Sequence, residues 1–217
     1  YNLSSPFPEE GNRQLVSRIS TFNWVPTKIA ADNLKKEGIT NIVLTGNTVV
    51  DACQSYNYKI KYDNKILITL HRRENFGNKI VDLFNELNQL AIKYPKLEFI
   101  FPMHPNPQIQ KHKHLLNNVH IINPLKYNEL LKLLSEVKFV ISDSGGIQEE
   151  CATFKKKILV CRDNTERPEG VNAGLAKIIG TNLIDNFNWA NNDCNWDGKN
   201  PYGNGKASNK ILQSLGH

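Results

Sequence analysis

Short apolar runs alternate with longer stretches of helical spacing along the chain, most regularly from Lys65 onward. Runs of three to five residues are typical of the buried strands of a parallel sheet. The predicted strands are Ile66–Leu70, Leu97–Phe101, Val119–Ile122, Phe139–Ile141, Ile158–Cys161 and Lys177–Gly180. Between them, apolar residues recur every three or four positions, as an amphipathic helix requires. The alternation predicts an α/β fold with a parallel sheet and helices on both faces.

The remaining elements are predicted with less regular patterns. Further helices are expected at Gln14–Ile19, from Pro26 to a stop at Gly38, at Ile80–Tyr94, at Ile109–Leu116, at Leu130–Leu134 and from about Lys206. Two more strands are expected at Thr21–Val25 and Asn41–Leu44. The asparagine-rich stretch Asn186–Asn204 is expected to be an exposed loop, and Tyr1–Pro8 an irregular one.

Every loop of unusual composition follows a predicted strand. These loops are His71–Gly77, Pro102–Pro107, Pro124–Tyr127, Ser142–Gly146 and Arg162–Gly170. Ligands of open α/β sheets bind at the carboxyl ends of the strands. We therefore expect the five loops to line one edge of the sheet together.

The stretch Lys138–Glu150 has the order strand, glycine pair, helix start. Gly145 and Gly146 would let an anion approach the backbone, and Ser144 is a candidate N-cap. The first-turn N–H groups and the helix dipole favour a phosphate there. Glu150 lies about one turn in, where a carboxylate could accept ribose hydroxyls. The alternative is a tight strand–helix turn that binds nothing.

Other loops carry groups that could act on such a ligand or be ordinary surface charges. His71, with Arg72 and Arg73, could neutralise a diphosphate and donate a proton. Arg167 could contact a phosphate or belong to a solvated charged loop. His104 could be a ligand contact or a loop histidine with local partners. Glu9 and Glu10 could supply a general base or be exposed acids.

Composition narrows the function classes. The chain has 217 residues and a formal net charge of +6. Its basic residues form no stripe with interleaved aromatics, so nucleic-acid binding is not expected, and an anionic small molecule suits the charge as well. No apolar run approaches the length of a membrane span. Four cysteines without a CxxC pair are interpreted as reduced residues of a cytosolic protein, without a disulfide or metal role.

Seven stretches in order resemble the UDP-N-acetylglucosamine 2-epimerase family of the non-hydrolysing, bacterial type. They are SPFPEEGNR at 5–13, TGNTVVDA at 45–52, HRRENFG at 71–77, HPNP at 104–107, SDSGGIQEE at 142–150, RDNTERPEGVNAG at 162–174 and NPYGNGKAS at 200–208. The resemblance implies a Rossmann-like parallel sheet, the carboxy-terminal half of a glycosyltransferase-B-type two-domain fold. It further implies that residues 1–45 are a remnant of the first domain and linker, 46–200 the UDP-binding domain, and 201–217 a helix crossing back to the first domain.

The resemblance also implies roles for individual residues. Glu9 and His71 match catalytic positions. Ser144, Gly145 and Gly146 match the diphosphate loop, Glu150 the ribose contact and Arg167 the arginine of the TERPE loop. Leu125 and Leu130 stand in the uracil-reading segment, where the family pattern has a polar and an aromatic residue, so looser or backbone contacts to the base are expected. Arg72 and His104 lie where some members bind an activating second substrate molecule.

The implied reaction interconverts UDP-N-acetylglucosamine and UDP-N-acetylmannosamine for cell-surface polysaccharide synthesis. UDP is eliminated to give 2-acetamidoglucal and adds back with inversion at C2, so no cofactor or metal is expected. The expected partners are a UDP-sugar and, in the full-length family, a second copy in a homodimer. A cytoplasmic location is expected.

Alternatives stay open. The family's first domain precedes SPFPEE, so the chain is expected to be amino-terminally truncated and inactive alone. It could then be an inactive or regulatory UDP-binding fragment. It could also belong to a related epimerase of another UDP-2-acetamido sugar, or to the hydrolysing type.

Overall fold

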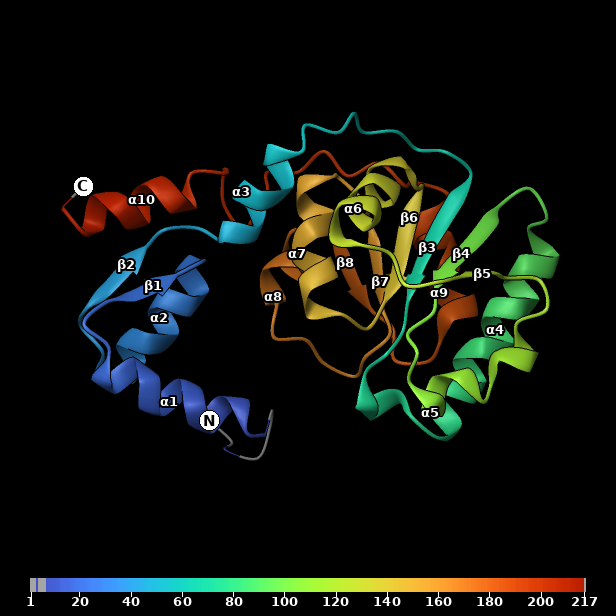
Figure 1. Cartoon of the computed structure of the whole chain (residues 1–217), viewed down its shortest axis with the longest axis horizontal. Coiled ribbons are helices and arrows are strands. Elements are labelled where there is room, and N and C mark those ends of the chain that lie inside the picture. Colours follow the sequence, from blue (N-terminus) through green and yellow to red (C-terminus); the bar gives the residue numbers. More distant parts are fainter. Residues whose placement is uncertain (1–2, 4–6, 217) are drawn as a thin grey trace. The chain divides into compact units, whose positions relative to one another are not determined.

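Six parallel strands in the order β5-β4-β3-β6-β7-β8 form the main sheet of the chain (Figure 1). The structure is a computed structural model that describes residue 3 and residues 7–216. The strands are β3 (Lys65–Thr69), β4 (Glu98–Pro102), β5 (His120–Ile122), β6 (Phe139–Ser142), β7 (Ile158–Val160) and β8 (Ala176–Ile178). The six strands predicted from Lys65 onward are therefore confirmed, with ends that differ by one or two residues.

Parallel strands are joined by crossover connections, and the helices in these connections bury both faces of the sheet. Ile66, Leu67 and Ile68 are fully buried although they point alternately to opposite faces. In the centre of the sheet, Leu67 pairs with Val140 and Thr69 with Ser142. This register brings the carboxyl ends of β3 and β6 side by side, so the loops after them begin at neighbouring positions.

Helices cover both faces of this sheet (Figure 1). They are η1 (Arg73–Asn75), α4 (Asn78–Lys93), α5 (Pro107–Gln110), η2 (Lys113–Leu115), α6 (Tyr127–Glu136), α7 (Gly145–Thr153), α8 (Pro168–Asn172) and α9 (Leu183–Asn191). The apolar stripes of α4 and α9 share one core with alternate residues of the strands. On the other face, α6 contacts β3, and α7 contacts β6 and β7.

The expectation that Asn186–Asn204 is an exposed loop is wrong, because α9 occupies part of it. Phe187 is 1% exposed and packs against the rings of Tyr94, Phe99 and Phe139. Asparagine has a weak helix propensity and suggests loops, but burial of an apolar stripe overrides propensity. That stripe is Leu183, Phe187 and Ala190, spaced four and three residues apart.

The expected helix Ile109–Leu116 is also wrong, since α5 and η2 replace it. Asn106 caps α5 by accepting from the Gln108 amide at 2.9 Å, and Pro107 starts the helix. The following residues, Lys111 to His114, offer no apolar side chain to hold a longer helix against the core. At the amino-terminal side, the helix expected from Gln14 begins earlier, at Glu9.

The chain divides into two compact units, Cys53–Pro201 around the main sheet and Tyr1–Ala52 with Tyr202–His217. The second of these contains α1 (Glu9–Ile19), β1 (Asn23–Val25), α2 (Lys28–Lys36), β2 (Ile42–Leu44), most of α3 (Thr48–Ser55) and α10 (Ala207–Ser214). The divisions fall after 52 and 201, where the sequence suggested 45 and 200. The expected irregular loop at Tyr1–Pro8 lies mostly outside the described residues.

In the smaller unit, β1 and β2 pair in parallel over a small core of Val25, Ala31, Leu34 and Ile39. The carboxy-terminal segment belongs to this unit because Asp51 accepts from the amides of Ala207 and Ser208, both at 3.1 Å. None of the helices in the described part of the chain is long and apolar enough to cross a membrane.

Replacing Phe187 by alanine tests the packing of α9. We expect Phe187→Ala to lower the free energy of unfolding by about 3–5 kcal/mol, because it removes a ring that fills the core. The control is Ile92→Ala on α4, where the side chain is 61% exposed, and where a change within about 0.5 kcal/mol is expected. Denaturant titration measures both. A Phe187→Ala variant as stable as the control would contradict the packing.

Candidate functional site

The buried carboxylate of Asp143 organises the carboxyl ends of β3 and β6. Asp143 is 0% exposed. Its oxygens accept from the backbone amides of His71 at 3.0 Å and Arg72 at 2.9 Å, and from the Asn75 side chain at 2.9 Å. Asn75 also donates to the carbonyl of Cys161 at 2.9 Å, after β7. One carboxylate and one amide thus connect the loops after three adjacent strands.

Sequence reasoning assigned no role to Asp143 or Asn75. The available signal was a carboxylate two residues after the buried apolar run Phe139–Ile141. Such a group is buried only where donors satisfy it, and backbone amides of a neighbouring strand end are the nearest donors.

His71 projects from this anchored loop. Its Nδ1 lies 3.5 Å from Asp143 Oδ1, and its ring stacks on that of His104 with centroids 6.0 Å apart. Burial lowers the pKa of His71, the Asp143 carboxylate opposes this, and Arg72 and His104 add to the lowering. The imidazole is therefore biased toward its neutral form, with Asp143 beside one ring nitrogen. Arg72 itself is exposed.

A cavity of about 220 Å³ opens beside His71. Its lining comes from the ends of β3 and β4, from the loops after β3, β4, β5 and β6, and from the first turns of α6 and α7: Thr69, Leu70, His71, Pro102, His104, Pro124, Leu125, Leu130, Ser144 and Ile147. Four of the five loops singled out in the sequence thus meet at one edge of the sheet, as predicted. Leu125 and Leu130, predicted for the same ligand site, both line the cavity. A mostly apolar lining with few polar groups suits a flat ring with polar edges.

The glycine pair begins α7, with Ser144 at the N-cap position. Contrary to the sequence-based expectation, the Ser144 side chain makes no capping hydrogen bond within the described part of the chain. The Ser144 amide donates instead to Ser142 Oγ at 2.9 Å. The Ser144 side chain lines the cavity, and the first-turn amides of Gly145 and Gly146 belong to a helix start of the kind that binds anions.

Arg167 comes from the fifth loop and lies against this helix start. A Cβ on Gly145 would stand 3.2 Å from Arg167 Cζ, so only glycine leaves the guanidinium in its place without adjustment. Arg167 Nε donates to Glu149 Oε1 at 3.0 Å, and the Arg167 amide donates to Thr165 Oγ1. The predicted phosphate loop and the predicted phosphate-binding arginine are therefore neighbours.

Arg162 supports that loop without belonging to the cavity. Its side chain is 4% exposed and forms charged hydrogen bonds to Glu74 and, at 2.7 and 2.8 Å, to Glu166. These bonds lower the pKa of Glu166 to about 2. Arg162 thus connects the loop after β7 with the loop after β3, a role that the sequence did not indicate.

Glu150 is a buried acceptor on α7. It is 6% exposed, and its Oε2 has no hydrogen-bond partner among the described residues. Burial raises its pKa, while hydrogen bonding from Tyr127 lowers it. A buried carboxylate oxygen without a donor is costly unless a ligand supplies one.

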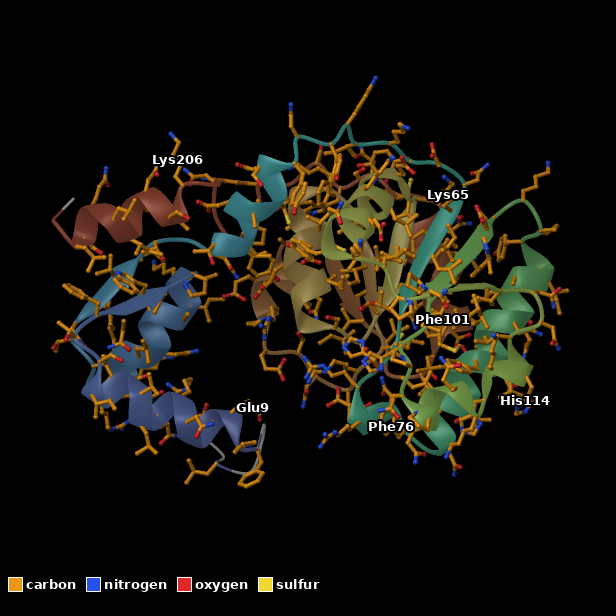
Figure 2. The ribbon with its side chains drawn as sticks, viewed as in Figure 1. Glu9, Lys65, Phe76, Phe101, His114 and Lys206 are labelled. Atoms are coloured by element: carbon orange, nitrogen blue, oxygen red, sulfur yellow. The ribbon has the colours of Figure 1, made fainter. Side chains whose placement is uncertain are left out.

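Glu9 lies in the smaller unit, at the start of α1 (Figure 2). It is exposed, whereas the adjacent Glu10 accepts from Arg13 at 2.7 Å and has its pKa lowered to about 2, chiefly by that bond. Arg13 also donates to Glu37 at 2.8 Å. Of the two acids, Glu10 is part of an ion-pair network and Glu9 is open to a ligand.

The four cysteines all lie among the described residues and are free thiols, with Cys53, Cys151 and Cys161 buried. Over residue 3 and residues 7–216, no three His, Cys, Asp or Glu side chains form a group that could hold a metal ion.

Replacing Asp143 by asparagine tests the anchor. We expect Asp143→Asn to cost about 2–3 kcal/mol in the free energy of unfolding, because its amide cannot accept at both oxygen positions. The amides of His71 and Arg72 should lose protection from hydrogen exchange. The matched control is Asp163→Asn, which breaks an exposed pair with Lys79 and should change stability by less than about 1 kcal/mol. Unchanged protection at both amides would refute the anchoring role.

Comparison with known proteins shows the family. The family model described as UDP-N-acetylglucosamine 2-epimerase matches residues 1–216. A UDP-N-acetylglucosamine 2-epimerase of Campylobacter jejuni is 40% identical and is matched by 99% of this chain. One of Neisseria meningitidis serogroup A is also 40% identical over 99% of the chain. The chain spans 65% and 66% of the lengths of these two relatives.

Solved structures of the same family are similar to this chain in fold. The UDP co-structure of MnaA from S. aureus has a TM-score of 0.87 at 36% identity, covering 99% of this chain and 65% of that one. The UDP-GlcNAc 2-epimerase of Neisseria meningitidis bound to UDP-GlcNAc has a TM-score of 0.85 at 38% identity, covering 99% and 66%. The fold is thus that of part of a glycosyltransferase-B-like two-domain protein. By its sequence over nearly its whole length and by its fold, the chain belongs to the UDP-N-acetylglucosamine 2-epimerase family.

Proposed function

We propose that the unit around the main sheet binds UDP, and that the chain supplies the nucleotide-binding part of an enzyme that interconverts UDP-N-acetylglucosamine and UDP-N-acetylmannosamine. The observation that carries the proposal is that three features lie together at α7. An apolar cavity, a glycine helix start with an arginine beside it, and a buried carboxylate oxygen without a partner all adjoin α7. These three features match the base, the diphosphate and the ribose of one ligand.

The diphosphate would lie at the start of α7. Amides of Gly145 and Gly146 would donate to it, and the helix dipole would contribute about 0.3–1 kcal/mol. Arg167 would add charge-assisted hydrogen bonds through its terminal nitrogens. Its Nε donates to Glu149, and its Nη1, which adjoins Gly145, lies 3.6 Å from Glu166 Oε2, beyond hydrogen-bond distance. His71, held by Asp143, would complete the anion site from the opposite loop.

The uracil would fit the cavity between Leu125, Leu130 and Ile147. These side chains offer apolar contact and no hydrogen-bond groups, so the polar edge of the base would be recognised by backbone. The ribose hydroxyls would donate to Glu150, which gives its Oε2 the partners that it lacks.

The chemistry assigned to the chain is elimination followed by addition. A base removes the proton at C2 of the sugar while the C1–O bond breaks and UDP leaves with the electron pair, giving 2-acetamidoglucal. UDP then re-forms the bond to C1 as a proton is delivered to the opposite face of C2. UDP is recovered in each cycle, so the reaction as proposed needs no metal or nicotinamide.

In this scheme the described residues have separate tasks. The α7 amides and Arg167 stabilise the charge that develops on the departing UDP. His71 contributes as well, because a bound diphosphate favours the protonated imidazole. Glu9 is our candidate for proton transfer at C2, because it is exposed while Glu10 is bound to Arg13. Arg72 and His104 are candidates for contact with a second, activating substrate molecule. The support is the placement of His104 against His71.

The similar proteins support the proposed binding of UDP more strongly than the proposed epimerisation. Solved family members are described with UDP and with UDP-GlcNAc bound. The chain spans about 65% of the length of the Campylobacter jejuni relative. All three features of the proposed nucleotide site lie in the unit Cys53–Pro201, and this favours a second proposal, that this unit binds UDP without epimerising it by itself. We further propose a cytoplasmic, homodimeric enzyme, for which the buried free thiols are the supporting observation as to compartment.

Calorimetric titration with UDP tests the proposed function. We expect Arg167→Ala to weaken UDP binding about ten-fold or more, or about 1.4 kcal/mol, because a charged donor to the diphosphate is lost. The control Arg18→Ala removes an arginine of α1 and should leave the affinity unchanged. If the folded wild-type chain binds no UDP at millimolar concentration, the proposal is wrong.

Gly145→Ala tests the helix start separately. The added Cβ would press on Arg167 and narrow the approach to the amides, so we expect UDP affinity to fall about ten-fold while the chain stays folded. Gly11→Ala is the matched control, since among the described residues no heavy atom lies within 4 Å of its added Cβ. Equal UDP affinity for Gly145→Ala and wild type would exclude the proposed diphosphate position.

A further inference from the structure

Glu150 is surrounded by few groups that can set its orientation. The titratable neighbours from other elements are Tyr127, the first residue of α6, and Cys53 on α3. Glu149 and Cys151 flank it on α7 itself. Glu149 is engaged by Arg167 Nε. Tyr127 is therefore the one hydroxyl among these neighbours that can donate to Glu150.

The ring of Tyr127 is held by its neighbours. It packs edge-on against Tyr56, with centroids 6.3 Å apart and an interplanar angle of 71°. Tyr56 in turn stacks on Tyr58 at 5.6 Å. These contacts fix the direction in which the hydroxyl points, because a phenol has only two side-chain torsions to place its oxygen.

The hydroxyl has two acceptors to choose from. Cys53 Sγ lies 3.9 Å away, a long contact even for sulfur. Burial raises the pKa of the Cys53 thiol to about 11, so the sulfur stays protonated and is a weak acceptor. The Glu150 carboxylate is the stronger acceptor and accepts the hydrogen bond that the Tyr127 hydroxyl donates.

Helix spacing relates this pair to the cavity. Leu130 lies three residues after Tyr127 on α6, and Ile147 three residues before Glu150 on α7. Residues three apart share a helix face. Because Leu130 and Ile147 both line the cavity, Tyr127 and Glu150 lie one turn away from it on the same two faces.

We propose that Tyr127 is a positioning residue, whose hydroxyl orients the buried Glu150 carboxylate so that its second oxygen accepts from the ribose of the bound nucleotide. The inference rests on the proposed nucleotide site and assigns to it a residue outside the cavity lining. Tyr127 thereby contributes to the preference for a nucleotide with ribose hydroxyls.

The same contact predicts a pH dependence. Burial raises the pKa of Glu150, hydrogen bonding from Tyr127 lowers it, and Glu149 raises it. The ionised carboxylate is the acceptor, so ribose-dependent affinity is present above this pKa and is lost as the pH falls through it. Without the Tyr127 hydroxyl the pKa of Glu150 rises further, and the loss begins at a higher pH.

Titration of the whole chain with UDP and with 2′,3′-dideoxyuridine diphosphate, from about pH 5 to about pH 8, tests the inference. We expect Tyr127→Phe to weaken UDP binding about three- to ten-fold, leave dideoxy affinity unchanged and shift the loss of UDP affinity to higher pH. Tyr56→Phe is the control, because it removes the neighbouring hydroxyl and keeps the ring.

Glu150→Gln provides the second variant. It should abolish both the preference for UDP and its pH dependence, and Tyr127→Phe should then have no further effect on UDP affinity. Equal weakening of both nucleotides by Tyr127→Phe, or an unchanged pH profile, overturns the inference while the nucleotide site stands. A wild-type chain that binds neither nucleotide overturns the site and the inference together.

Discussion

The hydrogen bonds to Asp143 are the interaction on which the candidate site depends most. A carboxylate at the end of the central strand β6 accepts two backbone amides from the loop after β3 and one side-chain amide from Asn75. The parallel register of β3 and β6 makes this possible, because Thr69 and Ser142 are paired. His71 and the α7 start receive their positions from this one buried group, since Asp143 lies between them in space and next to Ser144 in the chain.

Charged residues around the site divide into those that hold the loops and those that are available to a ligand. Arg162 is almost fully buried and engaged by two carboxylates. Its two partners are more open to solvent, since the side chains of Glu74 and Glu166 are 45% and 37% exposed, so the buried charge of the network is that of Arg162 itself. Arg167 is more exposed and lies beside the glycine helix start. Two arginines five residues apart thus have different physical roles, which composition alone does not distinguish.

Much of the fold follows from local pattern. The strands from Lys65 onward are short apolar runs, and the site loops follow them, so the edge at which they meet was predictable from the rule for parallel sheets. The start of α7 at the glycine pair was predictable, because a buried strand, a short polar stretch and a helical pattern follow one another there. The helix α9 was missed because asparagines masked an apolar stripe of only three residues, among them Phe187.

Other features depend on neighbours that are distant in sequence. Asn75 meets Asp143 across 68 positions, and Arg162 meets Glu74 across 88, distances over which no spacing rule operates. Glu10 differs from Glu9 because Arg13, three residues later on α1, donates to it, and Arg13 also donates to the distant Glu37. The sequence could not predict that Glu150 Oε2 is buried without a hydrogen-bond partner, because this depends on every element that packs around Glu150.

A crystal structure of the chain with UDP would show where the nucleotide binds. We expect the diphosphate at the amides of Gly145 and Gly146 beside Arg167, the ribose hydroxyls on Glu150, and the uracil between Leu125 and Leu130. Nucleotide density elsewhere, or an empty cavity in crystals grown with saturating UDP, would contradict this expectation.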